Sequence, residues 1–183
     1  MVKNILITGG AGYIGSHISE ILIKKNKNIF LIDNLSTGHR KLIHKKAKFF
    51  KIDISDEKKI SNIIKKNDID SIIHLAANLI IGEGQKNPKK YYKNNVDGTK
   101  KLLKACKGKN VKNIIFSSTA AIYKEGQYQV TENSKIKPKS VYGKTKMQAE
   151  KLIKNFSKKN RLNYGILRYF NICLLYTSPS PRD

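Results

Sequence analysis

Tyr142 and Lys146 are the two residues whose types and spacing most directly suggest chemistry. They lie four residues apart in the stretch YGKTK, and in a helix that spacing places both side chains on one face. A tyrosine with a pKa of about 10 is a poor base at neutral pH. A nearby ammonium group stabilises the phenolate, so we predict that Lys146 lowers the pKa of Tyr142 and makes it a general base.

The pattern Y-x-x-x-K alone has low specificity in a chain that is rich in lysine. Three neighbours strengthen it: Pro138 and Ser140 precede the pair, and Thr119 closely follows the predicted strand that ends at Ser117. A threonine hydroxyl there could hydrogen-bond a reacting hydroxyl group. These three neighbours argue against the alternative, in which Tyr142 is an exposed helix tyrosine without a role.

A glycine-rich loop follows the first predicted strand and opens the first predicted helix. Its sequence, TGGAGYIG from Thr8 to Gly15, fits G-x-G-x-x-G from Gly10 and the wider G-x-x-G-x-x-G from Gly9. Glycines permit the tight turn and let backbone N–H groups approach a pyrophosphate. The helix N-terminus then faces the phosphates with its partial positive charge. The loop therefore predicts a dinucleotide site.

An acidic residue stands where such a site needs one. Asp33 ends the second predicted strand, 18 residues past Gly15 (33 − 15). A carboxylate there accepts hydrogen bonds from ribose hydroxyls and repels a 2′-phosphate, so it predicts NAD rather than NADP. The alternative is a simple turn aspartate. Asp53, which precedes Ile54, could contact the adenine edge or simply cap a loop.

These residues need a scaffold of strands and helices, and the hydrophobic pattern supplies one. Short continuous apolar runs alternate with amphipathic segments, which is typical of a parallel sheet covered on both faces. We predict an α/β fold, a doubly wound parallel sheet of the Rossmann type that spans residues 1–172. The predicted strands are Asn4–Thr8, Asn28–Asp33, Lys48–Ile52, Ser71–Ala76, Val111–Ser117 and Asn163–Arg168, and the helices are Tyr13–Lys25, Asp56–Lys66, Pro88–Lys107 and Val141–Lys158.

The charge of the chain is strongly positive. The 37 Lys and Arg residues outnumber the 13 Asp and Glu residues, giving a net charge of +24. Nearly all of that charge is lysine spread over predicted helix faces, without an arginine cluster or interleaved aromatic residues, so we predict no nucleic-acid site. Cys106 and Cys173 show no paired spacing, so we predict neither a disulfide nor a metal site. No apolar run is long enough to span a membrane, and we expect a cytoplasmic protein.

The last eleven residues break with the rest of the chain. Residues 173–183 contain no Lys, Ile or Asn and two of the four prolines. The stretch resembles the translation of a transposon-end adapter used in sequencing libraries, so we expect it to be non-native. A native tail rich in proline and serine is the alternative. On the first interpretation, the natural sequence continues past Ile172 and the chain is truncated.

Seven stretches carry a resemblance to a known family. They cover essentially residues 1–172 and are TGGAGYIGSH (8–17), DNLSTGHR (33–40), HLAA (74–77), YYKNNVDGT (91–99), FSSTAAIY (116–123), SVYGKTK (140–146) and LRYFN (167–171). The chain resembles the extended short-chain dehydrogenase/reductases, and among them the UDP-glucose 4-epimerases of the NAD-dependent epimerase/dehydratase family. DNLSTGHR is the most specific of these stretches, whereas relatives with other activities share the remainder.

The resemblance implies roles for individual residues. The catalytic residues are Tyr142, Lys146 and Thr119, and the substrate contacts are Thr119, Tyr142, Phe170 and Asn171. The residues that hold NAD are Gly9, Gly12, Tyr13, Ile14, Gly15, Asp33, Asn34, Ser36, Thr37, Gly38, Asp53, Ile54, Leu75, Ala76, Ala77, Asn78, Asn94 and Lys146.

The implied reaction interconverts UDP-glucose and UDP-galactose by transient oxidation at sugar C4. Tyr142 takes the proton of the 4-hydroxyl, hydride passes to NAD, and after the keto sugar turns over hydride returns to the other face. The positive nicotinamide ring adds to the stabilisation of the phenolate. Ala120 and Ala121 stand where related dehydratases carry an Asp-Glu pair, so the resemblance does not extend to elimination.

Two other interpretations stay open at this point. One is an epimerase for another UDP-hexose or UDP-N-acetylhexosamine, and the other is a non-catalytic module that binds NAD or a polyanion. We expect a UDP-sugar substrate, no nucleic-acid or membrane partner, and a homodimer for the full-length form. For the 183-residue chain we predict NAD binding at best, with little or no epimerisation.

Overall fold

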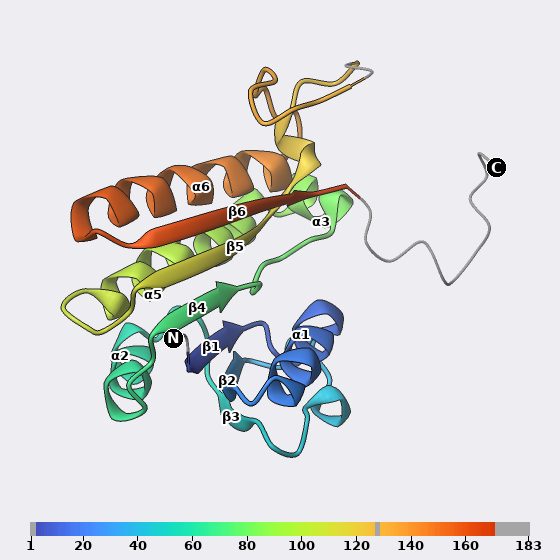
Figure 1. The fold of residues 1–183 in the computed structure, drawn as a ribbon. Helices are drawn as coiled ribbons and strands as arrows, with labels where there is room; N and C mark the ends of the chain where they lie inside the picture. The colour runs from blue at the N-terminus through green and yellow to red at the C-terminus, as the bar shows by residue number, and fades with distance from the viewer. Residues whose placement is uncertain (1–2, 127–128, 171–183) are drawn as a thin grey trace.

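A computed structural model describes residues 3–126 and 129–170 of the chain. Within these ranges one parallel sheet has the strand order β3-β2-β1-β4-β5-β6, and the order reverses between β1 and β4 (Figure 1). This order is that of the doubly wound dinucleotide-binding fold. It confirms the predicted fold class. The strands are β1 (Asn4–Thr8), β2 (Asn28–Asp33), β3 (Lys48–Lys51), β4 (Ser71–His74), β5 (Asn113–Thr119) and β6 (Asn163–Tyr169).

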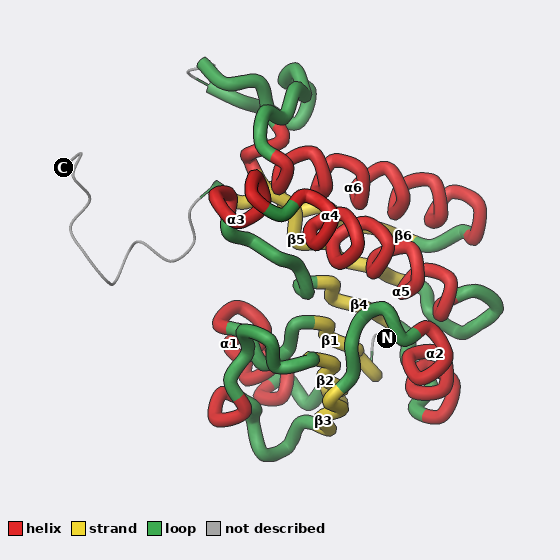
Figure 2. Tube along the Cα trace, turned by 180° about the vertical axis from the view of Figure 1, so that it is seen from behind, coloured by secondary structure: helices red, strands yellow, loops and turns green. Residues whose placement is uncertain are grey.

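Helices cover the two faces of the sheet unequally. Helix α1 packs on one face, whereas α2, α5 and α6 pack on the other (Figure 2). Short turns of 3₁₀ helix span Arg40–Leu42 and Ala120–Ile122, and a π-helical segment, η2, spans Tyr92–Gly98. The α-helices are α1 (Tyr13–Lys24), α2 (Glu57–Lys66), α3 (Ile81–Lys86), α4 (Pro88–Tyr91), α5 (Thr99–Cys106) and α6 (Val141–Asn160).

The strand pleat divides the core into two layers. Leu6 points to the face of α2, α5 and α6, whereas Ile5 and Ile7 on either side of it point to α1. These three side chains are at most 4% exposed, because the central strand is buried on both faces. Ile60 of α2 and Leu102 of α5 pack in the same layer as Leu6 and are fully buried.

The segment predicted as one long helix, Pro88–Lys107, is divided in the structure. Helices α4 and α5 are joined by η2, in which the backbone hydrogen-bond spacing widens for two turns. Such π segments have no strong sequence signal and often occur at functional sites. Helix α3 and the 3₁₀ turns were not predicted.

Strand β5 begins and ends two residues later than predicted. Its pairing with β6 runs from Asn113 opposite Asn163 to Thr119 opposite Tyr169. Pairing with β6 determines where β5 begins and ends. The intrinsic strand propensity of the β5 residues carries no information about that partner. As a result, Thr119 is the last residue of the strand and lies at its carboxyl end.

Among the described residues, no helix is both long and apolar enough to cross a membrane. In the same part of the chain, no group of three or more His, Cys, Asp or Glu side chains could hold a metal ion.

Candidate functional site

The glycine loop between β1 and α1 requires its glycines for steric reasons. Gly9 has φ +71°, and a Cβ atom on it would lie 2.8 Å from the backbone nitrogen of Ala76. A Cβ atom on Gly15 would lie 2.5 Å from the carbonyl oxygen of Gly9. The loop is therefore packed tightly against the residues that follow β4 and against the first turn of α1.

Helix α1 begins without any side chain that satisfies its N-terminus. Its N-cap is Gly12, no side chain caps the helix, and the first turn carries no acidic residue. The first backbone N–H groups of a helix lack intrahelical partners and carry a partial positive charge. The end of the helix is thus suited to bind a phosphate group.

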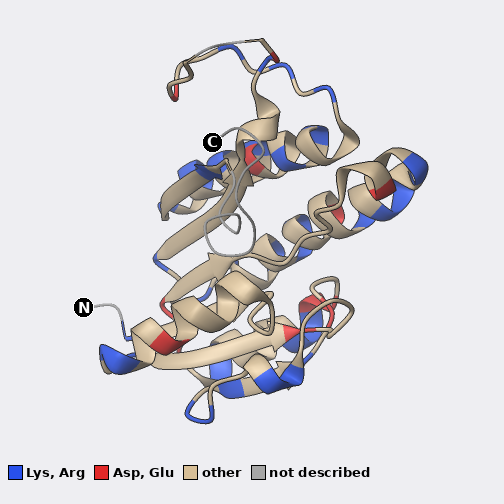
Figure 3. Ribbon diagram, turned by 90° about the vertical axis from the view of Figure 1, so that its right-hand side faces the viewer, with Lys and Arg blue, Asp and Glu red and all other residues tan. Residues whose placement is uncertain are grey.

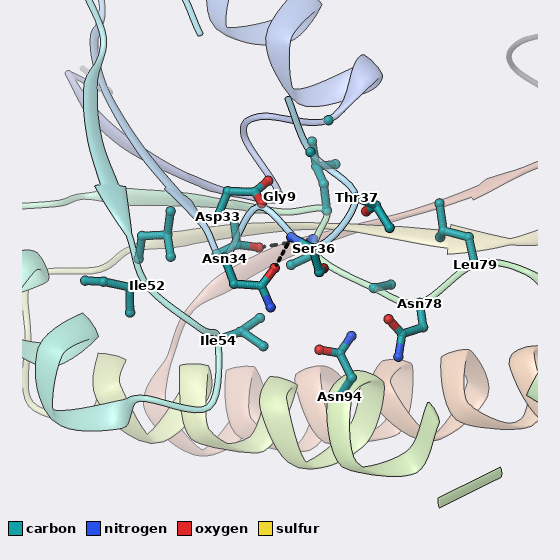
Figure 4. Close-up of a pocket in the computed structure, with 17 residues that line it drawn as sticks. Gly9, Asp33, Asn34, Ser36, Thr37, Ile52, Ile54, Asn78, Leu79 and Asn94 are labelled. Carbon is teal, nitrogen blue, oxygen red and sulfur yellow. Dashed lines mark hydrogen bonds between the residues drawn. The ribbon is translucent and has the colours of Figure 1, made fainter. Parts of the chain in front are cut away.

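A cleft opens beside this loop at the carboxyl ends of β1, β2, β3 and β4. Figure 4 shows Asp33, Asn34, Ile52 and Ile54 on one side of the cleft, with Asn78, Leu79 and Asn94 across from them. About 640 Å³ of empty space lies in and above it. The lining residues are Thr8, Gly9, Gly12, Ile32, Asp33, Asn34, Ser36, Thr37, Gly38, Ile52, Ile54, Leu75, Ala76, Ala77, Asn78, Leu79 and Asn94.

Asp33 is fixed at the floor of this cleft by two backbone donors. Its Oδ2 accepts a hydrogen bond from the backbone N–H of Ala11 at 3.1 Å, and its Oδ1 accepts one from that of Leu35 at 2.8 Å. A carboxylate has about four acceptor positions. Asp33 therefore keeps acceptor capacity for hydroxyl groups in the cleft while its orientation is set by the chain.

Asp53 does not line the cleft. Its Oδ2 accepts a hydrogen bond from the Asn34 side-chain amide at 2.8 Å, and its Oδ1 accepts one from the backbone N–H of Ser55 at 2.8 Å. Burial opposes its ionisation, but hydrogen bonds from Ser55 and Asn34 outweigh burial and hold the pKa of Asp53 below its usual value. This geometry corresponds to the loop-capping alternative, and it orients Asn34 toward the cleft.

The cleft collects most of the residues predicted to hold the cofactor, but not all. Tyr13, Ile14 and Gly15 lie in the first turn of α1 and are not among its lining residues. Thr8, Ile32, Ile52 and Leu79 line the cleft and were not predicted. The first three lie at the carboxyl end of a strand or just after one, which is the position where ligands bind in such sheets, so that rule could have identified them.

The predicted catalytic residues lie together next to the cleft. Thr119 ends β5, Tyr142 lies in the first turn of α6, and a hydrogen bond joins their hydroxyl groups. The Nζ atom of Lys146 lies 5.9 Å from the centre of the Tyr142 ring. Ser140 caps α6 by accepting a hydrogen bond from the backbone N–H of Gly143 at 3.0 Å, which fixes the start of the helix.

Burial affects the protonation of both members of this pair. Burial raises the pKa of Tyr142, and the hydrogen bond from Thr119 lowers it by less. The lowering of this pKa that we expect from Lys146 together with the positive nicotinamide ring stays a prediction. Lys146 is 1% exposed and donates to the carbonyl oxygen of Ser117 at 2.7 Å. Its burial lowers the pKa of Lys146 to about 7, although Glu150 partly opposes this effect.

A buried ion pair between Arg168 and Glu150 lies next to the strand ends that carry the catalytic residues. Arg168 on β6 donates to both carboxylate oxygens of Glu150 at 3.0 and 2.8 Å, and Glu150 also accepts a hydrogen bond from Ser118. Arg168 also donates to the Tyr123 hydroxyl at 2.9 Å. The pair joins α6 to both strands that end at the site, and no residue spacing in the sequence indicated it.

The predicted substrate residues are only partly within the described chain. Phe170 is 70% exposed and lines a separate hollow with Ala121, Tyr123 and Ser140. That hollow adjoins the start of α6 rather than the cleft. Asn171 lies outside the described residues, as does the stretch 173–183 that we expect to be non-native.

The positive charge does not gather on one face of this site. Figure 3 shows Lys and Arg distributed over several helices and loops. Among the described residues the exposed ion pairs, such as Lys24 with Glu20, join neighbouring positions on the surface.

A family model matches almost the whole chain. The model for the "NAD dependent epimerase/dehydratase family" aligns with residues 5–182. The chain belongs to this family. The resemblance seen in the sequence motifs is thereby confirmed, and so is the predicted class of cofactor, which the family description itself contains.

Individual relatives agree with that assignment. The UDP-glucose 4-epimerase of Lactobacillus helveticus is 43% identical over 169 residues, which are 92% of this chain and 51% of that protein. The crystal structure of UDP-glucose 4-epimerase from Brucella ovis, solved in complex with NAD, has a TM-score of 0.88 at 38% identity and covers 92% of this chain and 52% of that one.

A third relative was solved with a nucleotide sugar. UDP-glucose 4-epimerase from Thermotoga maritima, in a structure with UDP-glucose, has a TM-score of 0.86 at 33% identity and covers 91% of this chain and 55% of that one. The chain spans about half the length of the curated relatives it matches.

Proposed function

We propose that the chain binds NAD in the cleft between β2 and the segment that follows β4. Three features of the chain fit a dinucleotide. The glycine loop leaves no room for a Cβ atom at Gly9 or Gly15, α1 presents an uncapped N-terminus, and Asp33 is held at the cleft floor with free acceptor positions. The first two suit the pyrophosphate and the third suits the ribose hydroxyls.

We further propose that the longer protein, of which residues 1–172 form the N-terminal part, interconverts UDP-glucose and UDP-galactose. NAD, when bound, supplies the acceptor and donor of hydride at sugar C4. Tyr142 removes the proton of the 4-hydroxyl through its phenolic oxygen and later returns it. Thr119 orients that hydroxyl, and Lys146 contributes a buried charge beside the ring. The meeting of these three side chains at the carboxyl end of β5 carries the proposal.

The remaining expectations belong to the same proposal. A UDP-sugar is the substrate, the full-length form is a homodimer, and the protein acts in the cytoplasm. Phe170 begins the sugar site, because it follows β6 at the same edge of the sheet as Thr119. Asn171, the next residue in the sequence, continues that site.

The proposal is tested by incubating the longer protein with NAD and UDP-galactose and measuring the formation of UDP-glucose. We expect conversion by the longer protein and little or none by the 183-residue chain. UDP-N-acetylgalactosamine in parallel distinguishes the two sugar classes. Failure of the longer protein to convert any UDP-hexose would overturn the proposed reaction, and tight nucleic-acid binding without NAD binding would support the polyanion module instead.

A further inference from the structure

A buried line of polar groups runs from the nucleotide cleft into the centre of the molecule. Thr8, which lines the cleft, contacts Nδ1 of His74 through its hydroxyl at 2.8 Å, and Nε2 of His74 contacts the Thr99 hydroxyl at 2.8 Å. Thr99 in turn donates to the carbonyl oxygen of Asn95 at 2.7 Å. All four residues are at most 2% exposed. Buried polar groups of this kind are retained only when each is hydrogen-bonded.

The position of each proton in this line follows from the hydrogen bond that Thr99 donates to Asn95. The single hydroxyl proton of Thr99 goes to Asn95, so Thr99 can only accept from His74, and Nε2 must carry a proton. Burial, together with the nearby charge of Lys146, lowers the pKa of His74 to about 3, so the ring is neutral and Nδ1 is an acceptor. Thr8 then donates to Nδ1, and its oxygen accepts from the backbone N–H of Ala76 at 3.3 Å.

Asn95 extends the line to the catalytic helix. Its side-chain amide donates to the carbonyl oxygen of Asn78 at 3.0 Å and to the Thr145 hydroxyl at 3.1 Å, and Thr145 donates to the carbonyl oxygen of Tyr142 at 2.8 Å. The Oδ1 atom of Asn95 accepts from the backbone N–H of Asn78 and from the side chain of Asn94. Asn78 and Asn94 both line the cleft.

Two adjacent residues of the π-helical segment η2 make this double connection. Asn94 and Asn95 are adjacent in η2, yet Asn94 faces the cleft and Asn95 faces α6. The rotation of η2 about its axis therefore decides both contacts at once. Thr99, at the start of α5, is bound to the carbonyl group of Asn95 and is the point at which that rotation is held.

We propose that His74, neutral and protonated on Nε2, is a positioning residue that fixes η2 between the cleft and α6. His74 does not itself line the cleft, although it contacts Thr8, which does. It acts through Thr99 on Asn95, and through Thr8 on the segment at Ala76. The expected effect on NADH binding rests on the proposed function. The hydrogen-bond arrangement of His74, Thr99 and Asn95 does not depend on that function.

The first experiment determines the protonation of His74 in the unaltered chain. Long-range proton–nitrogen NMR of the ¹⁵N-labelled 183-residue chain reports the protonation of each of the four histidines, and the signals of His74 are assigned by their loss in His74→Gln. We expect the neutral form with the proton on Nε2. A proton on Nδ1, or a charged ring, would overturn the proposal whether or not the chain binds NAD.

The second experiment compares Thr99→Val, which removes the hydroxyl group at nearly constant volume, with Thr99→Ser, which keeps it. Thr131→Val on the surface is the matched control, because Thr131 is exposed. We expect Thr99→Val to shift the side-chain amide signal of Asn95 and to weaken NADH binding by about fivefold or more. Thr99→Ser restores both signal and affinity, and Thr131→Val changes neither.

Each failure has a separate meaning. The positioning role of His74 would be contradicted if Thr99→Val folds, keeps the Asn95 amide signal in place and binds NADH with wild-type affinity. A wild-type chain that binds no NADH would overturn the proposed cofactor site, while the NMR signals of His74 and Asn95 would still decide the inference about His74.

Discussion

The sheet is covered on both faces at β1 and β2 but on one face only at β5 and β6. Beneath α1, Ile7 of β1 and Leu31 of β2 are fully buried. On the same face, Ile115 of β5 is 40% exposed and Leu167 of β6 is 44% exposed. Among the described residues, Figure 1 shows α5 and α6 along one face of these two strands and no helix on the other. Parallel sheets normally have both faces covered.

The two regions also differ in how complete their sites are. The cleft by β1 and β2 has a floor, two walls and a helix N-terminus, all supplied by described residues. The catalytic residues at the end of β5 adjoin an exposed Phe170 and a shallow hollow. We infer that dinucleotide binding can be studied on this chain alone, whereas turnover is expected only of the longer protein that we propose.

The largest expected effect separates chemistry from binding. In the longer protein we expect Tyr142→Phe to lower the rate of epimerisation by about 10²-fold or more, because it removes the proton acceptor. NADH affinity stays at the wild-type value, since Tyr142 does not line the cleft. Tyr164→Phe, on exposed β6, is the matched control. Equal activity of Tyr142→Phe and wild type, measured under saturating substrate, would remove Tyr142 from the mechanism.

A pair of isoleucine substitutions tests the difference in sheet coverage. Ile7→Ala leaves a cavity between β1 and α1, and we expect a loss of about 2–5 kcal/mol in the free energy of unfolding. Ile115→Ala on the open face should cost less than about 1 kcal/mol. Urea unfolding measures both. Similar losses for the two variants would mean that the face of β5 is covered in solution.

The glycine loop is tested by adding a side chain. Gly15→Val brings a Cβ atom against the carbonyl oxygen of Gly9, and we expect NADH binding to weaken by about tenfold or more. Gly82→Ala is the control, because no atom lies within 4 Å of the added Cβ there. Fluorescence titration gives both affinities. Unchanged binding by Gly15→Val would show that the loop does not contact the nucleotide.

A further effect depends on pH and arises at β4, which lies between the two regions in the sheet. The pKa of His74 falls from 6.5 in the unfolded chain to about 3 in the fold. The unfolded chain therefore binds the proton more readily below pH 6.5, and the contribution of neutral His74 to stability is lost progressively as the pH falls from 6.5 to 3. We expect about 1.4 kcal/mol per pH unit in this window. Unfolding curves for wild type and His74→Gln should diverge accordingly, and parallel curves would contradict this reading.

The sequence predicted local and periodic features well. All six strands were predicted, with ends that differ by no more than two residues, and so was the glycine loop that precedes α1, because their signals are short runs of apolar residues and glycines at fixed spacing. The π segment η2, the partners of Lys146 and the pair of Glu150 with Arg168 were not predicted. Each depends on contacts between residues that are distant in the sequence. Lys146, for example, lies beside the ring of Tyr142 but donates its hydrogen bond to the carbonyl oxygen of Ser117.

The central claim is that the cleft in this chain holds NAD through Asp33. The most direct test is a fluorescence titration of the 183-residue chain with NADH and with NADPH under the same conditions. We predict that NADH binds at least about tenfold more tightly, a difference of ~1.4 kcal/mol, and that Asp33→Ala narrows the gap. Equal affinity for the two dinucleotides, or no binding of either, would contradict the account.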